Sequence, residues 1–194
     1  TKKFSGSLQS ATTAKDMILE EYPDAQITVI DSTVNTVLQG LYVLEACRLR
    51  DMGLEYQQIV DALLPIRETG RIFFTIGSID YLKHGGRIGR LAGIAASALK
   101  IKPVMGSTDE GAICQLDQAR GMNKALVKMA QNIVDKTKDS ENKILAISHC
   151  NCGERAQLLR NALQERMPAK DIVILDTAGV SSMYANDGGV IVAV

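Results

Sequence analysis

Short runs of β-branched and aliphatic residues alternate with helix-forming segments along these 194 residues, and this alternation is the strongest constraint on the fold. The clearest helical pattern follows Gly121, where apolar residues recur at the spacing of one helix face: Leu126, Met129, Ala130, Ile133 and Val134. The segment 143–148, which is apolar at 144–147, is typical of a buried strand. Strands that alternate with helices in this way predict an α/β fold.

The same patterns place the other elements. Helices are predicted from the Ser5-Gly6-Ser7 start to about Glu21, at 35–51, 56–68, 78–83, 90–100, after Gly121, and at 154–167. Strands are predicted at 26–30, 71–76, 101–105, 112–117, 143–148, 172–175 and 190–194. The strands at 101–105 and 112–117 are joined by a turn rich in Ser, Asp and Gly, which predicts an antiparallel pair and therefore a mixed sheet. We expect a domain boundary near Gly70.

Composition and charge exclude several classes of function. Lys plus Arg and Asp plus Glu both number 22, so no net field attracts nucleic acid or an anionic membrane. Aromatic residues make up 4% and Trp is absent, which argues against base stacking. No apolar run approaches the roughly 20 residues of a membrane span, and the four cysteines show no disulfide framework. We therefore expect a cytoplasmic protein. Because residue 1 is Thr, we also expect a piece of a longer chain.

A glycine-rich turn at residues 85–89 leads into a helix of small and aliphatic residues at 90–100. Glycine lets a backbone approach a ligand closely, and arginine side chains such as that of Arg87 grip a carboxylate or phosphate. The small side chains of Ala95 and Ala96 leave room for something apolar. This stretch indicates a ligand with an anionic head and an apolar body. A tight helix–helix turn with solvated arginines remains the alternative.

The Ser5-Gly6-Ser7 segment starts a helix, and Ser5 is a candidate N-cap. Free backbone N–H groups at a helix start can bind an anion. A cap with no ligand is the competing interpretation.

Three other patterns are weaker evidence for a function. His149-Cys150-Asn151-Cys152 has soft-metal ligands but no second pair of ligands at zinc-site spacing, so we predict no metal. The glycines of 85–93 match neither the P-loop nor the dinucleotide-binding spacing. With only His84 and His149 available, no Ser/His/Asp triad is indicated.

Five segments in this order resemble the motifs of the DegV family of bacterial fatty-acid-binding proteins: IDYLKHGGRIGRLAG, IKPVMG, QARGMNKAL, AISHCNCGERAQLL and GVSSMYANDGGVIVAV. The opening KKFSGSLQSA resembles the Ser-Gly motif of that family at a helix start. The resemblance implies the two-domain EDD fold. Residues 1–70 would then be the latter part of a three-layer α/β N-terminal domain that is truncated here. Residues 71–194 would be a C-terminal α/β lipid-binding domain with a mixed sheet.

The resemblance also implies site residues. The fatty-acid carboxylate would lie near Ser5, Gly6 and Ser7, with Arg87 in the glycine-rich turn and Arg120 facing a partner. Near the C-terminus many relatives have His-Thr-Gly-Pro-Gly, whereas this chain has Tyr184-Ala185-Asn186-Asp187-Gly188. A tyrosine can donate a hydrogen bond to a carboxylate but cannot become a cation. We therefore include Tyr184 among the candidate ligand residues.

On this basis the chain is expected to bind a long-chain fatty acid, such as palmitate, stearate or oleate, between its two domains. It would present the carboxylate to a separate fatty acid kinase without being an enzyme itself, and it would need no cofactor. Two alternatives remain. One is a nucleotide-dependent phosphotransferase that uses the GGRIG turn. The other is a regulatory or interaction module that binds no lipid.

Overall fold

The computed structural model describes residues 2–3, 5–78, 80–86 and 101–194, which form two compact units. The first unit comprises residues 1–70 with 109–112, and the second comprises 71–108 and 113–194. The functional assignment of the ranges 1–70 and 71–194 stays a prediction.

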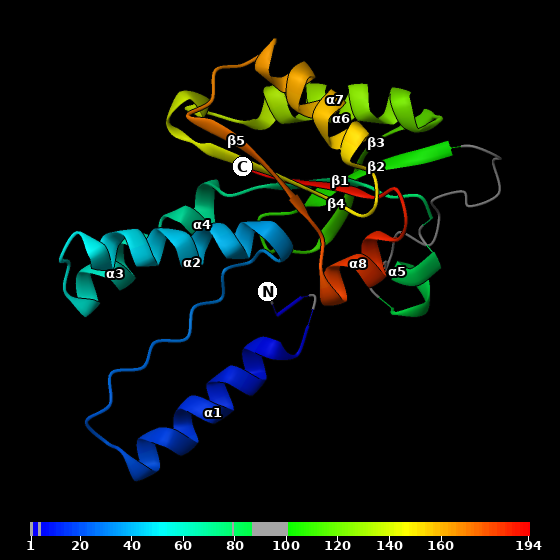
Figure 1. Ribbon diagram of the computed structural model, residues 1–194. Helices are drawn as coiled ribbons and strands as arrows, with labels where there is room; N and C mark the ends of the chain where they lie inside the picture. The colour runs from blue at the N-terminus through cyan, green and yellow to red at the C-terminus, as the bar shows by residue number, and fades with distance from the viewer. Residues whose placement is uncertain (1, 4, 79, 87–100) are drawn as a thin grey trace. The chain divides into compact units, whose positions relative to one another are not determined.

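The described part of the first unit is helical (Figure 1). Its helices are α1 (Ser7–Glu21), α2 (Thr36–Asp51), α3 (Tyr56–Leu63) and α4 (Ile66–Thr69). Helix α3 starts with a capping box, in which the Gln58 side chain accepts a hydrogen bond from the Glu55 N–H at 2.9 Å. Helix α2 buries Leu38, Tyr42 and Leu49. In contrast, α1 buries none of its residues and exposes Met17 and Ile18.

Two predictions for this unit are wrong. The strand predicted at 26–30 does not form, because these residues have no regular secondary structure and no ladder partner within the described chain. The predicted helix 56–68 is broken into α3 and α4 at Pro65. Proline has no N–H to donate and its ring clashes with the preceding turn, which explains the break.

The second unit is built on a six-stranded mixed sheet in the order β3-β2-β1-β6-β4-β5. Its strands are β1 (Ile72–Thr75), β2 (Ile101–Ser107), β3 (Ile113–Arg120), β4 (Ile144–His149), β5 (Asp171–Asp176) and β6 (Val190–Ala193). Strands β4 and β5 are parallel, and the other neighbours pair antiparallel. The predicted α/β class and mixed sheet are confirmed.

Helices α6 (Met122–Lys136) and α7 (Gly153–Gln164) cover one face of this sheet (Figure 1). Helix α6 turns a stripe of apolar residues toward the sheet, since Ala125, Met129 and Ile133 are fully buried at helical spacing. Leu145 and Ile147 of β4 and Val190 and Val192 of β6 meet them in one core. Complete burial of each large aliphatic side chain stabilises the fold by about 1.5–3 kcal/mol.

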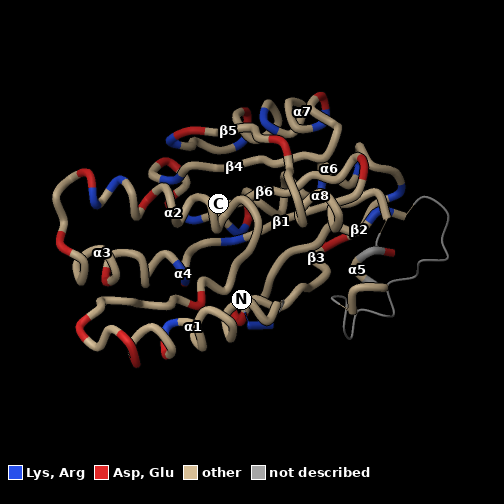
Figure 2. The backbone as a smooth tube through the Cα atoms, turned by 60° about the horizontal axis from the view of Figure 1, so that its bottom comes forward, with Lys and Arg blue, Asp and Glu red and all other residues tan. Residues whose placement is uncertain are grey.

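Two shorter helices, α5 (Asp80–His84) and α8 (Gly179–Ala185), contact each other in the second unit. Within the sheet, the buried Thr75 hydroxyl donates a hydrogen bond to the Pro103 carbonyl at 2.9 Å, which ties β1 to β2. Acidic and basic positions are interspersed along the described backbone of each unit (Figure 2). No helix in the described ranges is long and apolar enough to cross a membrane.

Candidate ligand-binding residues

The Ser5-Gly6-Ser7 segment lies exposed at the start of α1, and its hydroxyl groups are tied together. The Ser5 and Ser7 hydroxyl oxygens are 2.7 Å apart, and the Ser5 hydroxyl accepts a hydrogen bond from the Ser7 N–H at 3.2 Å. Gly6, not Ser5, is the N-cap residue, and no side chain caps the helix. The N–H groups of Leu8 and Gln9 have no hydrogen-bond partner among the described residues. Together with the Ser5 hydroxyl, these groups can bind an anion.

Arg120 is the last residue of β3, where it pairs with Ile101 of β2. The next residue, Gly121, has a φ of 85°, which lets the chain turn sharply into α6. The Arg120 side chain is exposed, and it makes no ion pair or hydrogen bond within the described part of the chain. Its guanidinium is therefore available to a partner or a ligand.

Tyr184 lies near the end of α8 and is half-buried. The Thr177 hydroxyl, just before α8, is hydrogen-bonded to the Ser182 hydroxyl within the helix, with the two oxygens 2.8 Å apart. At the other end the helix stops at Asn186, whose N–H donates to the Ser182 carbonyl at 2.9 Å. Residues 186–189 form the loop between α8 and β6; we call it the Asn186–Gly189 loop.

The turn from His149 to Gly153 lies against this loop at the end of β4. The Cys150 N–H donates to the Gly189 carbonyl at 3.0 Å, and the Gly188 N–H donates to the Cys150 carbonyl at 2.8 Å. The Cys152 thiol donates to the Gly189 carbonyl at 3.4 Å. Burial raises the pKa of the Cys152 thiol, and the neighbouring Arg155 opposes that shift. This turn therefore serves as a support for the loop.

His149 has two neighbours at its Nδ1 atom. The Asp176 carboxylate oxygen and the Cys152 backbone nitrogen each lie 3.4 Å away. All four cysteines are free thiols. Among the described residues no three His, Cys, Asp or Glu side chains are grouped so that they could hold a metal ion.

Other predicted site residues cannot be placed. Arg87, Ala95 and Ala96 lie outside the described residues, so their assignment to a ligand site stays a prediction. The structure thus places Ser5, Gly6 and Ser7 together in the first unit. Arg120 and Tyr184 both belong to the second unit, on β3 and α8.

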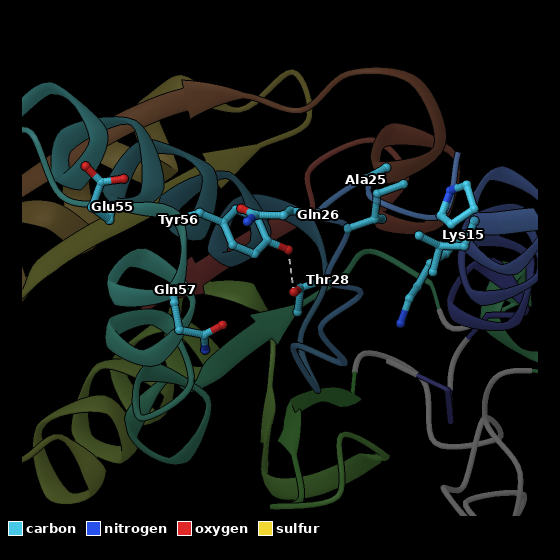
Figure 3. Close-up of a pocket in the computed structure, with 10 residues that line it drawn as sticks. Lys15, Ala25, Gln26, Thr28, Glu55, Tyr56 and Gln57 are labelled. Carbon is cyan, nitrogen blue, oxygen red and sulfur yellow. Dashed lines mark hydrogen bonds between the residues drawn. The ribbon is translucent and has the colours of Figure 1, made fainter. Parts of the chain in front are cut away.

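The structure adds a cavity of about 560 Å³ in the first unit that the sequence did not indicate (Figure 3). It is lined by Lys15, Leu19, Pro23, Ala25, Gln26, Ile27, Thr28, Glu55, Tyr56 and Gln57. The Tyr56 hydroxyl points toward the Thr28 hydroxyl, and the two are hydrogen-bonded. Lys15 is about two turns along α1 from Ser7. No motif links these residues, because they come from three separate segments.

Arg155 was also missed. Its guanidinium Nη1 donates a hydrogen bond to the Gly188 carbonyl at 2.9 Å. The adjacent glycines 188 and 189 were the only signal, since paired glycines often mark a close approach of another group to the backbone.

Comparison with known proteins places this arrangement in a family. The model of the DegV family, described as "Uncharacterised protein, DegV family", matches residues 1–194. A DegV domain-containing protein of Clostridium perfringens is 32% identical over 171 residues, covering 88% of this chain and 59% of the relative. Another, of Streptococcus pneumoniae, is 32% identical over 191 residues, covering 98% of this chain and 67% of the relative. The chain thus spans about three fifths to two thirds of the length of these relatives.

Solved structures agree with this match. A DegV family protein of Ruminococcus gnavus, refined with vaccenic acid, has a TM-score of 0.94 and 42% identity, covering 100% of this chain and 69% of that one. The Fatty Acid Kinase (Fak) B3 protein of Streptococcus pneumoniae, loaded with linoleic acid, has a TM-score of 0.91 and 30% identity, covering 100% and 68%. A stearic acid-binding protein of Eubacterium ventriosum has a TM-score of 0.84 and 32% identity, covering 100% and 67%.

The fold defines an α/β protein with the architecture of these solved structures. The chain belongs to the DegV family. The resemblance drawn from its motifs is confirmed.

Proposed function

We propose that this protein binds a long-chain fatty acid. The observation that carries the proposal is the match to the Ruminococcus gnavus protein, whose fold is shared over the whole of this chain and whose structure was refined with vaccenic acid. The carboxylate would dock at Ser5, Gly6 and Ser7, with Arg87 and Tyr184 as further polar partners. The acyl chain would lie along the segment that contains Ala95 and Ala96.

Two features of the α1 start support a carboxylate there. The Leu8 and Gln9 N–H groups are unpaired within the described chain, and the positive end of the helix dipole favours an anion. Removal of an acyl chain from water adds about 0.8 kcal/mol per CH₂, or on the order of 10 kcal/mol for 16 carbons before entropic losses. Affinity would therefore come from the chain, and orientation from the head group.

We further propose that the protein is a carrier and not a catalyst. It would present the bound carboxylate to a separate fatty acid kinase, with the exposed Arg120 facing that partner. This step is supported by the likeness to the Streptococcus pneumoniae protein, which is named as a fatty acid kinase B protein. A cytoplasmic location belongs to the same proposal.

The first test is the ligand itself. Native mass spectrometry of the purified protein should show a co-purified acid of about 16 to 18 carbons, whose acyl chain gives the hydrophobic gain calculated above. Protein that carries no acid and does not take up added oleate would contradict the proposal. Binding of ATP by this protein alone would instead favour the phosphotransferase.

The second test concerns the head group. Replacement of Ser5 by Ala should weaken oleate binding by about one to two decades, because a charge-assisted hydrogen bond is lost. Stability should fall by less than about 1 kcal/mol, since Gly6 is the N-cap residue and the Ser5 side chain is exposed. Oleate titration and thermal unfolding measure the two effects.

Ser10→Ala is the matched control, because Ser10 is an exposed serine on the same helix. It should change neither quantity. If Ser5→Ala lowers stability and leaves affinity unchanged, Ser5 only supports the helix start.

A further inference from the structure

The backbone of Asn186 has φ 56° and ψ 171°, a region that is open to glycine and costly for residues with a Cβ atom. Such a conformation persists only when its surroundings hold it in place. Asn186 follows the last residue of α8, so the backbone strain lies where that helix joins the Asn186–Gly189 loop. The contacts around the loop show what holds it.

Arg155 provides the side-chain contact. It lies in the first turn of α7, and its Nη1 donates to the Gly188 carbonyl at 2.9 Å. A Cβ atom on Gly188 would clash with this nitrogen, so any other residue at 188 would force the guanidinium out of its present position. The backbone bonds between Cys150 and residues 188–189 hold the same loop from the end of β4.

The loop in turn packs against the C-terminal end of α8. A Cβ atom on Gly189 would lie 2.3 Å from the Ala185 carbonyl oxygen, so the Gly189 backbone packs tightly against the last residue of the helix. The Gly189 N–H also donates to the Asn186 carbonyl at 3.1 Å. A displacement of residues 188 and 189 therefore moves the final turn of α8, which carries Tyr184.

We propose that Arg155 is a positioning residue: it holds the Asn186–Gly189 loop in its strained conformation and thereby orients Tyr184. The contacts above hold the loop, and the role of Tyr184 toward a fatty acid rests on the proposed function.

The test begins with Arg155→Met, which keeps an apolar stem and removes every donor. Amide hydrogen exchange, resolved by mass spectrometry, should become about tenfold faster in the segment 184–189, the factor expected for one lost hydrogen bond. Exchange in α6 should not change. Arg166→Met is the matched control, because Arg166 is an exposed arginine just beyond α7, and it should leave the 184–189 segment unchanged.

Rescue separates positioning from a general loss of stability. In the double variant Arg155→Met with Asn186→Gly, the loop no longer needs to be held, because glycine adopts this conformation freely. Slow exchange at 184–189 should return. If exchange is not faster in Arg155→Met, or if the glycine does not restore protection, Arg155 does not position the loop.

Should Arg155→Met fail to fold, Arg155→Gln serves in its place. Its side chain ends two bonds short of the position of Arg155 Nη1, so the hydrogen bond to the Gly188 carbonyl is lost while a polar side chain is kept. The 184–189 segment should again exchange faster and again be rescued by Asn186→Gly, and unchanged exchange in this variant would equally overturn the proposal.

Oleate titration of the same variants tests the link to the ligand. Arg155→Met should weaken oleate binding by about tenfold, and the double variant should recover most of that loss. Faster exchange with unchanged oleate affinity would overturn the orientation of Tyr184 toward the ligand. Wild-type protein that binds no oleate would contradict the proposed function, while the exchange measurements would still decide the role of Arg155.

Discussion

At the scale of single residues, Asn186 has a side chain in a backbone conformation that favours glycine. Replacement by glycine should raise the free energy of unfolding by about 1 kcal/mol. The gain is limited because the Asn186 side chain accepts a hydrogen bond from the Asp187 N–H at 2.8 Å. Urea unfolding measures the change. Asn186→Ala is the control: it keeps the strain and loses the hydrogen bond, so it should destabilise. Equal destabilisation by both substitutions would mean that glycine relieves no backbone strain at this position.

Tyr42 is a second residue with an internal conflict. It is 7% exposed, and its hydroxyl is buried without a hydrogen-bond partner within the described structure. An unpaired buried hydroxyl costs about 1–3 kcal/mol. Tyr42→Phe should therefore leave stability at pH 7 unchanged or increase it by about 1 kcal/mol. Thermal unfolding checks this, with a clear loss of stability as the contrary outcome.

The same residue predicts a pH dependence. Burial raises the pKa of Tyr42 from 10.0 to about 12, with Arg67 opposing the shift. Because the pKa is higher in the folded state, the neutral phenol supports folding below pH 10, and this contribution is lost as pH rises toward 12. Wild-type protein should lose stability over this range more steeply than Tyr42→Phe. Urea unfolding at several pH values measures this loss. If the free energy of unfolding falls equally with pH in both proteins, Tyr42 ionises as easily in the folded state as in the unfolded state.

At the scale of elements, the sequence predicted well wherever packing and periodicity agree. The stripe of Met129, Ala130 and Ile133 was read as one helix face, and it is the buried face of α6. Residues 26–30 have the β-branched composition of a strand, yet a strand exists only when a partner supplies hydrogen bonds. The break in the predicted helix 56–68 follows from local chemistry, because Pro65 lacks the N–H that a continuous helix needs there.

Site residues were harder to predict than elements. The helix start at Ser5-Gly6-Ser7 could be predicted because such a start has a local signature, whereas its role in ligand binding stays a prediction. The contact between Arg155 and Gly188 joins positions that are 33 residues apart, and no spacing rule connects them. The cavity lined by Lys15, Thr28 and Tyr56 is equally non-local.

The helix predicted at 90–100 carries an expectation about acyl length. Ala95→Phe or Ala96→Phe should shift the preferred fatty acid toward shorter chains or abolish binding, because the added ring fills space that methylene groups would occupy. A series of acids from 12 to about 18 carbons, titrated against each variant, measures the shift, since each CH₂ adds about 0.8 kcal/mol where it can be buried. Ala130 of α6 is the control, because it is fully buried in the core. Its replacement should unfold the protein without changing which acyl length is preferred. An unchanged length preference in every folded variant of 91–99 would contradict the assignment.

At the scale of the whole molecule, the proposed kinase partnership depends on a surface and not on the core. Arg120→Ala should slow kinase-dependent phosphorylation of the bound acid by about tenfold or more, if its guanidinium makes one charged contact. Stability should stay within about 1 kcal/mol, since the side chain is exposed. Arg166→Ala should change neither the rate nor the stability. Phosphorylation of Arg120→Ala at the wild-type rate would exclude this role.

Strand β6 comes last along the chain among the described strands, but it lies inside the sheet between β1 and β4. The β1–β2–β3 group and the β4–β5 pair make no direct ladder with each other, so β6 joins them. On the ribosome, this sheet cannot close until residues 190–193 have been synthesised. Until then β1 and β4 each present an open edge, a hazard for pairing with other nascent chains. We therefore expect the second unit to fold late, after its synthesis is nearly finished, and to depend during synthesis on chaperones that shield strand edges.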